Sequence, residues 1–382
     1  MRLLTRIVQI LVGLLFIFSG IIKANDPLGL SYKMQEFFEL WSAGLLQGHF
    51  FLRTPLVSLL DFLHDHSLTL SIIMITLEII AGVAVIIGWS RNFILYLLLV
   101  LIIFFTFLTG YAYLSGKFTN CGCFGDCLPI TPLTSFTKDV ILLFLILLLL
   151  AGRRYIMRPI TARAGNFIII FILFVCLFAQ WYMLTYLPVL DCLPFKKGNV
   201  IAEQMHPPKG SVPDSFAIRF IYEKNGVRYQ FSPENLPADF TTYKYIDRQQ
   251  TLVRKGNAEP AIKGFVLTGI SGEDSTETIL QLPECLLLFC LDFSKTNWLP
   301  SFKQVVSEAG KKNVPVFVAS PSLVDGKKMF DKEGLAEVPQ FNTDYTVVRT
   351  VARTNPTLLL LKKGVIINKY PAIKLKDAIR NL

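Results

Sequence analysis

The sequence predicts an α-helical membrane bundle followed by an α/β soluble domain. Only 17% of the 382 residues are charged, whereas soluble domains carry about 25%. The deficit is confined to the first half: residues 1–190 hold 12 Lys/Arg and 8 Asp/Glu, which leaves 26 and 20 of the totals of 38 and 28 for residues 191–382. The second half therefore has the composition of a soluble domain, and it is long enough to bury a core.

Five apolar segments predict membrane-spanning helices. A bilayer core of about 30 Å needs about 20 apolar residues in helical form, because its backbone polar groups cannot be hydrated there. The fourth segment is the weakest, and its first turn, with Lys138 and Asp139, is expected at the membrane interface. The first segment could instead be a cleaved signal peptide, but the large Ile22 at the −3 position disfavours cleavage near Ala24. The predicted spans are Ile7–Ile22, Leu68–Gly88, Phe93–Leu114, Phe136–Gly152 and Asn166–Leu187.

The arginines predict the orientation of the spans. If the spans alternate in direction, seven arginines without an acidic residue fall on one side, and the opposite loops mix Lys23, Lys33 and Arg53 with carboxylates. Arginine-rich ends face the cytoplasm. We therefore predict a bacterial inner-membrane protein with a cytoplasmic N-terminus and a periplasmic C-terminal domain, given a second membrane. The lipid bilayer is then a partner, and the thinly spread net charge of +10 argues against nucleic acid. The seven arginines are Arg2, Arg6, Arg91, Arg153, Arg154, Arg158 and Arg163.

Three of the seven cysteines cluster in the loop between the third and fourth predicted spans. Cys121, Cys123 and Cys127 lie there on the predicted oxidising side, and Cys192 follows the last span at the same membrane surface. Glycines between the cysteines allow tight turns, so several sulfur atoms can converge. Three interpretations stay open: thiols that exchange a disulfide, an inert disulfide that staples the loop, and a metal site. The spacing lacks the paired cysteines typical of zinc, and no metal ligand set is predicted.

Glu78 is a carboxylate inside the second predicted span. An ionisable residue at that depth is a functional candidate by default. One interpretation is a polar clamp that binds Ser, Thr or Tyr groups of the bundle, and another is a proton acceptor beside the cysteine loop or a quinone.

Several motifs of the first half resemble a known membrane family. Phe16–Pro27 resembles the end of the first helix of DoxX-type proteins, Glu78–Gly88 resembles their second helix, and Cys121–Gly125 is similar to the loop of the MauE branch. The resemblance covers residues 1–155 and implies a four-helix bundle, to which residues 156–190 add a fifth span. It also implies a redox-associated role, because MauE proteins are linked to maturation of a disulfide-rich periplasmic subunit and DoxX relatives to thiosulfate:quinone oxidation.

The second half divides at about residue 257. Residues 191–257 read as a linker with a small β-hairpin, in which Asn225-Gly226 is a favoured two-residue turn. Residues 258–382 alternate buried strands and helices. Cys285 and Cys290 lie on one strand with opposite orientations, so we interpret both as buried apolar residues.

The order of elements over residues 258–382 resembles a thioredoxin-like domain of the TlpA kind. The resemblance implies that Pro356 is a cis proline facing the start of the first helix, where the family carries Cys-x-x-Cys. Here Ser294 and Asn297 stand at those positions, and no cysteine follows Cys290. The fold is therefore expected without its thiol chemistry, as a vestigial site that binds a partner segment.

Three functions compete, and whether the protein is an enzyme stays open. The first is a thiol–disulfide-linked maturation or electron-relay factor for exported client proteins, in which Cys121, Cys123, Cys127 and Cys192 carry the exchange. The second is a non-enzymatic scaffold or assembly subunit with a fixed disulfide. The third is a quinone-coupled oxidoreductase subunit, with a quinone as its cofactor, although no haem or flavin motif supports it.

Overall fold

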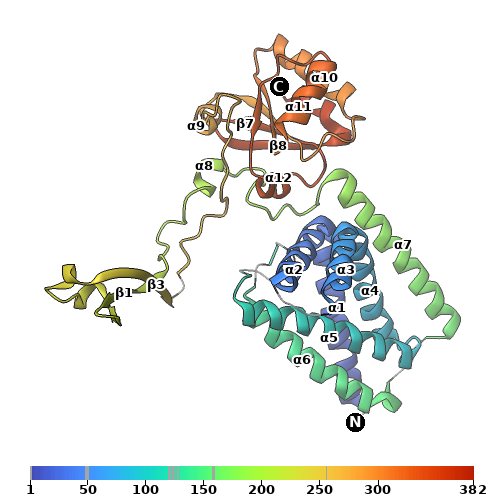
Figure 1. Ribbon diagram of the computed structural model, residues 1–382. Coiled ribbons are helices and arrows are strands. Elements are labelled where there is room, and N and C mark those ends of the chain that lie inside the picture. The colour runs from blue at the N-terminus through green and yellow to red at the C-terminus, as the bar shows by residue number, and fades with distance from the viewer. Residues whose placement is uncertain are drawn as a thin grey trace.

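Five long helices form the membrane part of the protein (Figure 1). The computed structural model describes residues 2–47, 51–118, 122, 125, 127–128, 130–156, 160–254 and 256–382. Within these residues five helices are long and apolar enough to cross a membrane, as the sequence predicted. They are α1 (Arg2–Asn25), α4 (Ser67–Ile87), α5 (Arg91–Ser115), α6 (Pro132–Ala151) and α7 (Ala162–Tyr186).

Helices α1, α4, α5 and α6 share one apolar core, and α7 lies at its edge. Val12, Phe16, Ala84, Leu98 and Ile146 are all buried in that core. Only 11% of the most apolar stretch of α7 is buried, compared with 50% in α1 and in α4. The helix α7 is therefore the peripheral fifth span, and most of its surface is left for lipid.

Two glycines allow α1 and α4 to approach closely. A Cβ atom at Gly82 would lie 2.7 Å from the carbonyl oxygen of Gly13, and a Cβ at Gly13 would lie 2.7 Å from the carbonyl oxygen of Gly82. Small residues at helix crossings are typical of membrane proteins, in which backbones pack closely to gain van der Waals contact. Gly13 and Gly82 thus allow the backbones of α1 and α4 to come into contact.

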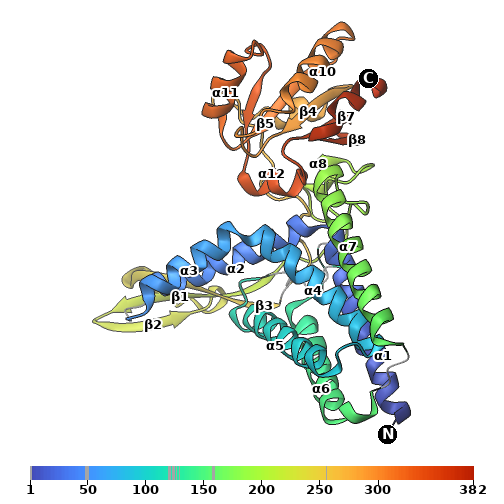
Figure 2. The same ribbon diagram turned by 90° about the vertical axis from the view of Figure 1, so that its right-hand side faces the viewer.

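The segment between the first two spans is helical, where the sequence predicted a loop. It forms two helices, α2 (Pro27–Gln47) and α3 (Arg53–Asp65), which pack side by side (Figure 2). Aromatic contacts hold α2 against the C-terminal end of α5 and the residues after it. The ring centroids of Phe37 and Phe118 lie 4.2 Å apart, and those of Trp41 and Tyr111 lie 5.7 Å apart. The prediction that Lys23 lies in this loop is also wrong, because Lys23 is buried in the last turn of α1.

A small antiparallel sheet stands apart from the rest of the molecule (Figure 1). The predicted hairpin at Asn225-Gly226 is confirmed, since both residues have positive φ and join two paired strands. A third strand pairs with the first strand of this hairpin. The sheet has the order β2-β1-β3, with β1 (Ser215–Lys224), β2 (Val227–Phe231) and β3 (Lys244–Arg254), and short 3-10 turns at Pro233–Asn235 and Phe240–Thr242.

The C-terminal domain is a five-stranded mixed sheet with helices on both faces. The strand order is β6-β5-β4-β7-β8, in which β4, β5 and β6 are parallel and β7 and β8 antiparallel to their neighbours. The strands are β4 (Cys285–Phe289), β5 (Val316–Ser320), β6 (Gln340–Asn342), β7 (Thr357–Lys362) and β8 (Val365–Pro371). The helical elements are α8 (Ile201–Gln204), α9 (Thr276–Leu280), α10 (Leu299–Lys311), α11 (Leu323–Lys332), α12 (Tyr345–Val351) and the 3-10 segment η4 (Ala372–Asn381).

The central strand β4 feeds two separate apolar cores. Cys285, Leu287 and Phe289 belong to the core under α9 and α12, and Leu286, Leu288 and Cys290 face α10 and α11. The prediction that Cys285 and Cys290 are buried on opposite faces is confirmed. Phe195 and Ile201 belong to the first core, so the residues predicted as a tether help to build the domain.

We expect Gly82→Ala to destabilise the membrane bundle. The added methyl group has no space against the Gly13 carbonyl, and such overpacking costs about 1–3 kcal/mol. Gly44→Ala is the matched control, because nothing lies within 4 Å of a Cβ there. Denaturant unfolding in detergent micelles measures both, and equal stabilities would contradict the close α1–α4 packing.

Candidate functional site

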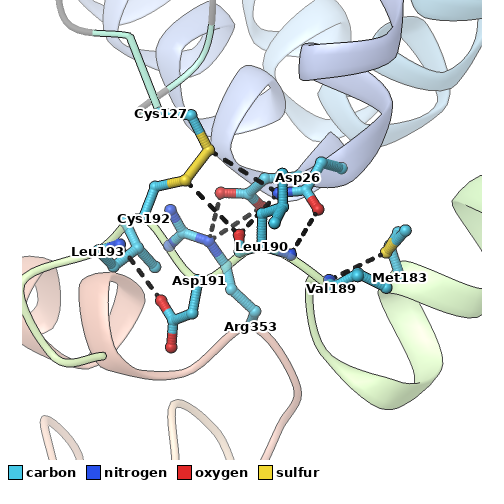
Figure 3. The surroundings of a disulfide bond; sticks show 10 residues. Asp26, Cys127, Met183, Val189, Leu190, Asp191, Cys192, Leu193 and Arg353 are labelled. Carbon is cyan, nitrogen blue, oxygen red and sulfur yellow. Dashed lines mark hydrogen bonds and ion pairs between the residues drawn. A yellow bond between two sulfur atoms is a disulfide. The ribbon is translucent and has the colours of Figure 1, made fainter. Parts of the chain in front are cut away.

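A disulfide joins two of the predicted site cysteines, Cys127 and Cys192 (Figure 3). Their Cα atoms lie 4.9 Å apart across a sequence separation of 65 residues. The bond ties the loop before α6 to the segment after α7. Cys121 and Cys123 lie outside the described residues, so their predicted part in the site stays a prediction.

Asn25, the last residue of α1, fixes the chain beside the disulfide. Its amide group exchanges two hydrogen bonds with the backbone of Leu190, at 2.8 and 3.0 Å. The same Asn25 Nδ2 atom lies 4.0 Å from the Cys127 Sγ atom. A single side chain therefore orders the segment that leads to Cys192 and contacts the sulfur of Cys127.

The two bridged cysteines differ in exposure, and both differ from the other described cysteines. Cys192 is exposed and Cys127 is half-buried. Cys176, Cys285 and Cys290 are unbridged and buried. Burial raises the pKa of the Cys285 thiol to about 12, with Glu284 adding to the rise, and burial also raises the pKa of Cys290. Because the thiolate is the reactive form, chemistry at a described cysteine is confined to the Cys127–Cys192 bond.

Ion pairs and a cation–π contact hold the C-terminal domain against the membrane part. The Arg353 Nε atom donates to both carboxylate oxygens of Asp26, at 2.8 and 3.0 Å, and the Arg353 side chain is only 4% exposed. The guanidinium of Arg349 lies 3.6 Å above the ring of Tyr32, and Arg349 also bonds Gln35. Buried arginine–carboxylate pairs of this kind add geometric specificity as well as energy. Figure 3 shows Arg353 and Asp26 directly beside the disulfide.

A second contact fixes the segment that carries Cys192. The Lys369 Nζ atom on β8 lies 2.8 Å from a carboxylate oxygen of Asp191. Burial lowers the pKa of Lys369, and the attraction of Asp191 opposes that fall. The residue next to Cys192 is thus anchored to the soluble domain, while Cys192 itself faces solvent.

A cleft of about 700 Å³ lies between the two parts of the protein, and Cys192 lines it. One wall is α2, through Tyr32, Lys33 and Glu36, and the other is α12, through Thr346 and Arg349. Gly122, which stands between the two undescribed cysteines, approaches the same wall, because a Cβ there would lie 3.0 Å from Lys33 Cγ. Gly122 therefore lies close to the wall that α2 contributes to this cleft.

Glu78 binds a partner that the sequence analysis did not anticipate. Its Oε2 atom lies 2.7 Å from Lys23 Nζ, and the two side chains are 4% and 3% exposed. The ammonium of Lys23 also lies 4.4 Å from the Phe105 ring centroid, and the predicted Ser, Thr or Tyr partners of Glu78 stay a prediction. Lys23 escaped prediction because it stands near the end of an apolar run and resembles a residue of the following loop.

A second buried carboxylate lies close to this pair. Asp139 is 1% exposed, so its side chain is enclosed by the protein. It accepts a hydrogen bond from Thr109 at 3.0 Å and pairs with Lys138 at 2.9 Å. Lys23, Glu78, Lys138 and Asp139 surround one chamber of about 20 Å³, which is enough for a single water molecule.

The residues predicted as a vestigial thioredoxin site lie at the end of β4. Ser294 and Asn297 are exposed, and the Asn355–Pro356 peptide bond is cis, as the resemblance implied. Asn355 Nδ2 donates to the backbone and side-chain oxygens of Asp292, both at 2.9 Å, and Leu291 N donates to Asn355 Oδ1. These hydrogen bonds join the loop that contains Pro356 to the loop that contains Ser294. Asn297 is not among the residues that they connect.

In the part of the chain that the structure describes, no three His, Cys, Asp or Glu side chains lie close enough together to hold a metal ion. His64 lies 3.0 Å from Glu39, and the ring of His66 stacks on Phe62.

The interdomain contacts were the main omission of the sequence analysis. Asn25, Asp26, Tyr32, Asp191 and Arg353 are single polar or aromatic residues at segment ends. Nothing in their local pattern distinguishes them from solvated loop residues, because their partners are more than 150 residues away in sequence.

We expect Glu78→Leu to destabilise the bundle by about 3–5 kcal/mol, because it leaves the Lys23 ammonium buried without its partner. Replacing both residues, as Lys23→Met with Glu78→Leu, removes the charge pair altogether and is expected to restore most of that loss. Unfolding free energies in micelles measure the cycle. A double variant as unstable as the sum of its single variants would show that the two charges do not stabilise one another.

Comparison with known proteins assigns two segments of the chain. Residues 216–255, which include the small sheet, match the model of a domain of unknown function, DUF8463. No curated protein and no solved structure matches the chain. Residues 1–152, which contain α1 to α6, match the family model described as methylamine utilisation protein MauE. The membrane part of this chain is therefore similar to the MauE family of membrane proteins.

Proposed function

We propose that this protein is a membrane-bound thiol–disulfide exchange factor for exported proteins, and that Cys127–Cys192 is its exchanging bond. One observation carries the proposal: Cys192, an exposed residue of this disulfide, lines a cleft between the membrane part and the soluble domain. A structural staple needs no such access. The similarity of residues 1–152 to the MauE family, named for methylamine utilisation, agrees with a membrane-bound protein.

The exchange step begins at Cys192, because it is the more exposed residue of the pair. A client thiolate attacks Cys192 Sγ, forms a client–Cys192 disulfide, and releases Cys127 as a thiolate. A second client thiolate then attacks the client sulfur of that mixed disulfide, which releases Cys192 and leaves the client oxidised by two electrons. The Cys127–Cys192 pair ends as a dithiol, so the electrons balance between the client and this bond.

The distribution of charge supports a periplasmic location for the site. Arg6 and Arg91 lie at the end of the bundle away from the soluble domain, where Arg6 bonds the backbone of Ile86 and Trp89 bonds Asn166. Arginine-rich ends remain in the cytoplasm. The disulfide then faces the compartment in which disulfides persist, and the organism is taken to have an inner membrane.

The soluble domain serves, in this proposal, as a thioredoxin-like docking unit without thiols of its own. Its strand order and the cis Pro356 support that identity. Helix α12 and Arg353 lie close to that proline in sequence, and both face the membrane part. The domain thus covers the disulfide and supplies one wall of the cleft.

We expect mild reductant to open the Cys127–Cys192 bond in the folded protein while the buried thiols stay unmodified. Differential alkylation followed by mass spectrometry would then label Cys127 and Cys192 together, and leave Cys176, Cys285 and Cys290 unlabelled. Cys192→Ser is expected to abolish client-linked species in intact cells. Cys285→Ser is the control, because that thiol is buried and unreactive.

The opposite result would favour a scaffold. If the bond resists mild reductant and no client adduct forms, the disulfide is a staple, and the protein is a non-enzymatic assembly subunit. The network of Asn25, Asp26 and Asp191 around the bond is the observation that supports this alternative.

A groove on the surface of the helix bundle favours a second candidate function, that of a quinone-coupled oxidoreductase subunit. It has a volume of about 480 Å³, lies between α1 and α6, and is lined by Leu15, Leu133, Thr137, Lys138 and Ile141. Its mostly apolar lining suits an isoprenoid tail. Lys138 also lines the inner chamber that holds Glu78.

We expect a short-chain benzoquinone to re-form the disulfide from the reduced protein if this coupling exists, with the quinone becoming quinol. Thr137→Trp, which fills the groove, should slow that reaction, and Val175→Trp at an exposed position of α7 should not. Failure of the quinone to oxidise the dithiol would remove this candidate and leave the exchange proposal intact.

A further inference from the structure

The shape of the cleft restricts what can reach Cys192. Its floor is the segment Cys192–Pro194, and its walls are α2 and α12. The walls are joined directly by the Arg349–Tyr32 stack at 3.6 Å and by the Arg353–Asp26 pair. The two parts of the protein therefore cannot separate around a bulky partner without breaking buried charge contacts.

The volume of the cleft sets the size of the occupant. About 700 Å³ lies within the range of pockets that hold small ligands or a few residues, roughly 300–1,000 Å³. A folded domain of about 100 residues has a radius of gyration of about 13 Å and cannot enter. An extended chain advances only about 3.3 Å per residue and is narrow enough to pass.

The chemistry of the walls suits a polypeptide of mixed sequence. Lys33 is paired with Glu36 at 2.9 Å, Arg353 is paired with Asp26, and Arg349 is held by Tyr32 and Gln35. Two of these three cations are thus paired with carboxylates, and Arg349 keeps its charge against an uncharged ring and amide. Hydroxyl groups of Thr346 and Thr350 also line the cleft, and such groups can bond a peptide backbone in any sequence.

We infer that the substrate of this site is an extended, unfolded segment of a polypeptide that carries a cysteine, and not a folded thiol protein. The inference rests on the proposed exchange at Cys127–Cys192 and names the class of client for it. The client is then a newly exported chain that has not completed folding. A folded redox partner would find Cys192 behind the walls of the cleft.

The test compares three thiols on the full-length protein in lipid nanodiscs. They are glutathione, a short unstructured peptide with one cysteine, and a folded protein with one surface cysteine, matched in thiol pKa. Opening of the disulfide is followed by alkylation of Cys127 and Cys192. The peptide is expected to react faster than the folded protein by about tenfold or more, since positioning of the reacting thiol alone can change rates by that factor.

A cleft-filling variant tests the route directly. Thr346 is exposed on α12 and lines the cleft, so Thr346→Trp should slow the peptide while glutathione reacts as before. Thr346→Ala, which removes the hydroxyl group without filling space, should keep most of the peptide rate. Ser307→Trp places the same bulk on the exposed surface of α10 and should change nothing.

The outcomes test the substrate class and the exchange reaction separately. If the folded protein reacts as fast as the peptide, or if Thr346→Trp leaves the peptide rate unchanged, the substrate class is wrong while the exchange proposal survives. If neither glutathione nor the peptide opens the bond in the unaltered protein, the exchange itself fails, and the substrate inference fails with it.

Discussion

The end of helix α1 and the residue after it connect the membrane bundle, the disulfide and the C-terminal domain. Three polar residues that are nearly consecutive make three different connections: Lys23 to Glu78 inside the bundle, Asn25 to the segment beside the disulfide, and Asp26 to Arg353 of the soluble domain. Each contact is buried or partly buried, so an unpaired group would pay a large desolvation cost. The position of α1 along the membrane normal is therefore fixed at the same time as the position of the soluble domain.

The buried charges explain why the bundle has one arrangement. Transmembrane helices gain little from the hydrophobic effect on packing together, because lipid is as apolar as their side chains. Close approach at Gly13 and Gly82 supplies van der Waals contact, and the Lys23–Glu78 pair supplies a specific register. A rotation of α4 that kept its apolar contacts would leave Glu78 facing lipid, which costs several kcal/mol.

Much of this architecture is readable from local pattern. The five spans, the hairpin at Asn225-Gly226 and the opposite orientations of Cys285 and Cys290 follow from hydropathy, turn chemistry and the two-residue period of a strand. The helices α2 and α3 were missed because they mix charged and apolar residues between two strong spans. The pairing of Cys127 with Cys192 was left open, since spacing alone favoured no partner among four cysteines. The ion pair of Asp26 and Arg353 joins residues that are 327 positions apart. A single sequence carries no signal for such a pair.

The disulfide also encloses two spans in a covalent ring. The chain between Cys127 and Cys192 contains α6 and α7 with the turn that joins them. Sulfur atoms at its two ends meet only when both helices have crossed the bilayer, one in each direction. The bond can therefore close only after both helices are in place, and it can do so before the C-terminal domain is complete, because that domain follows Cys192 in the sequence. A nick in the turn between α6 and α7 would leave both pieces joined.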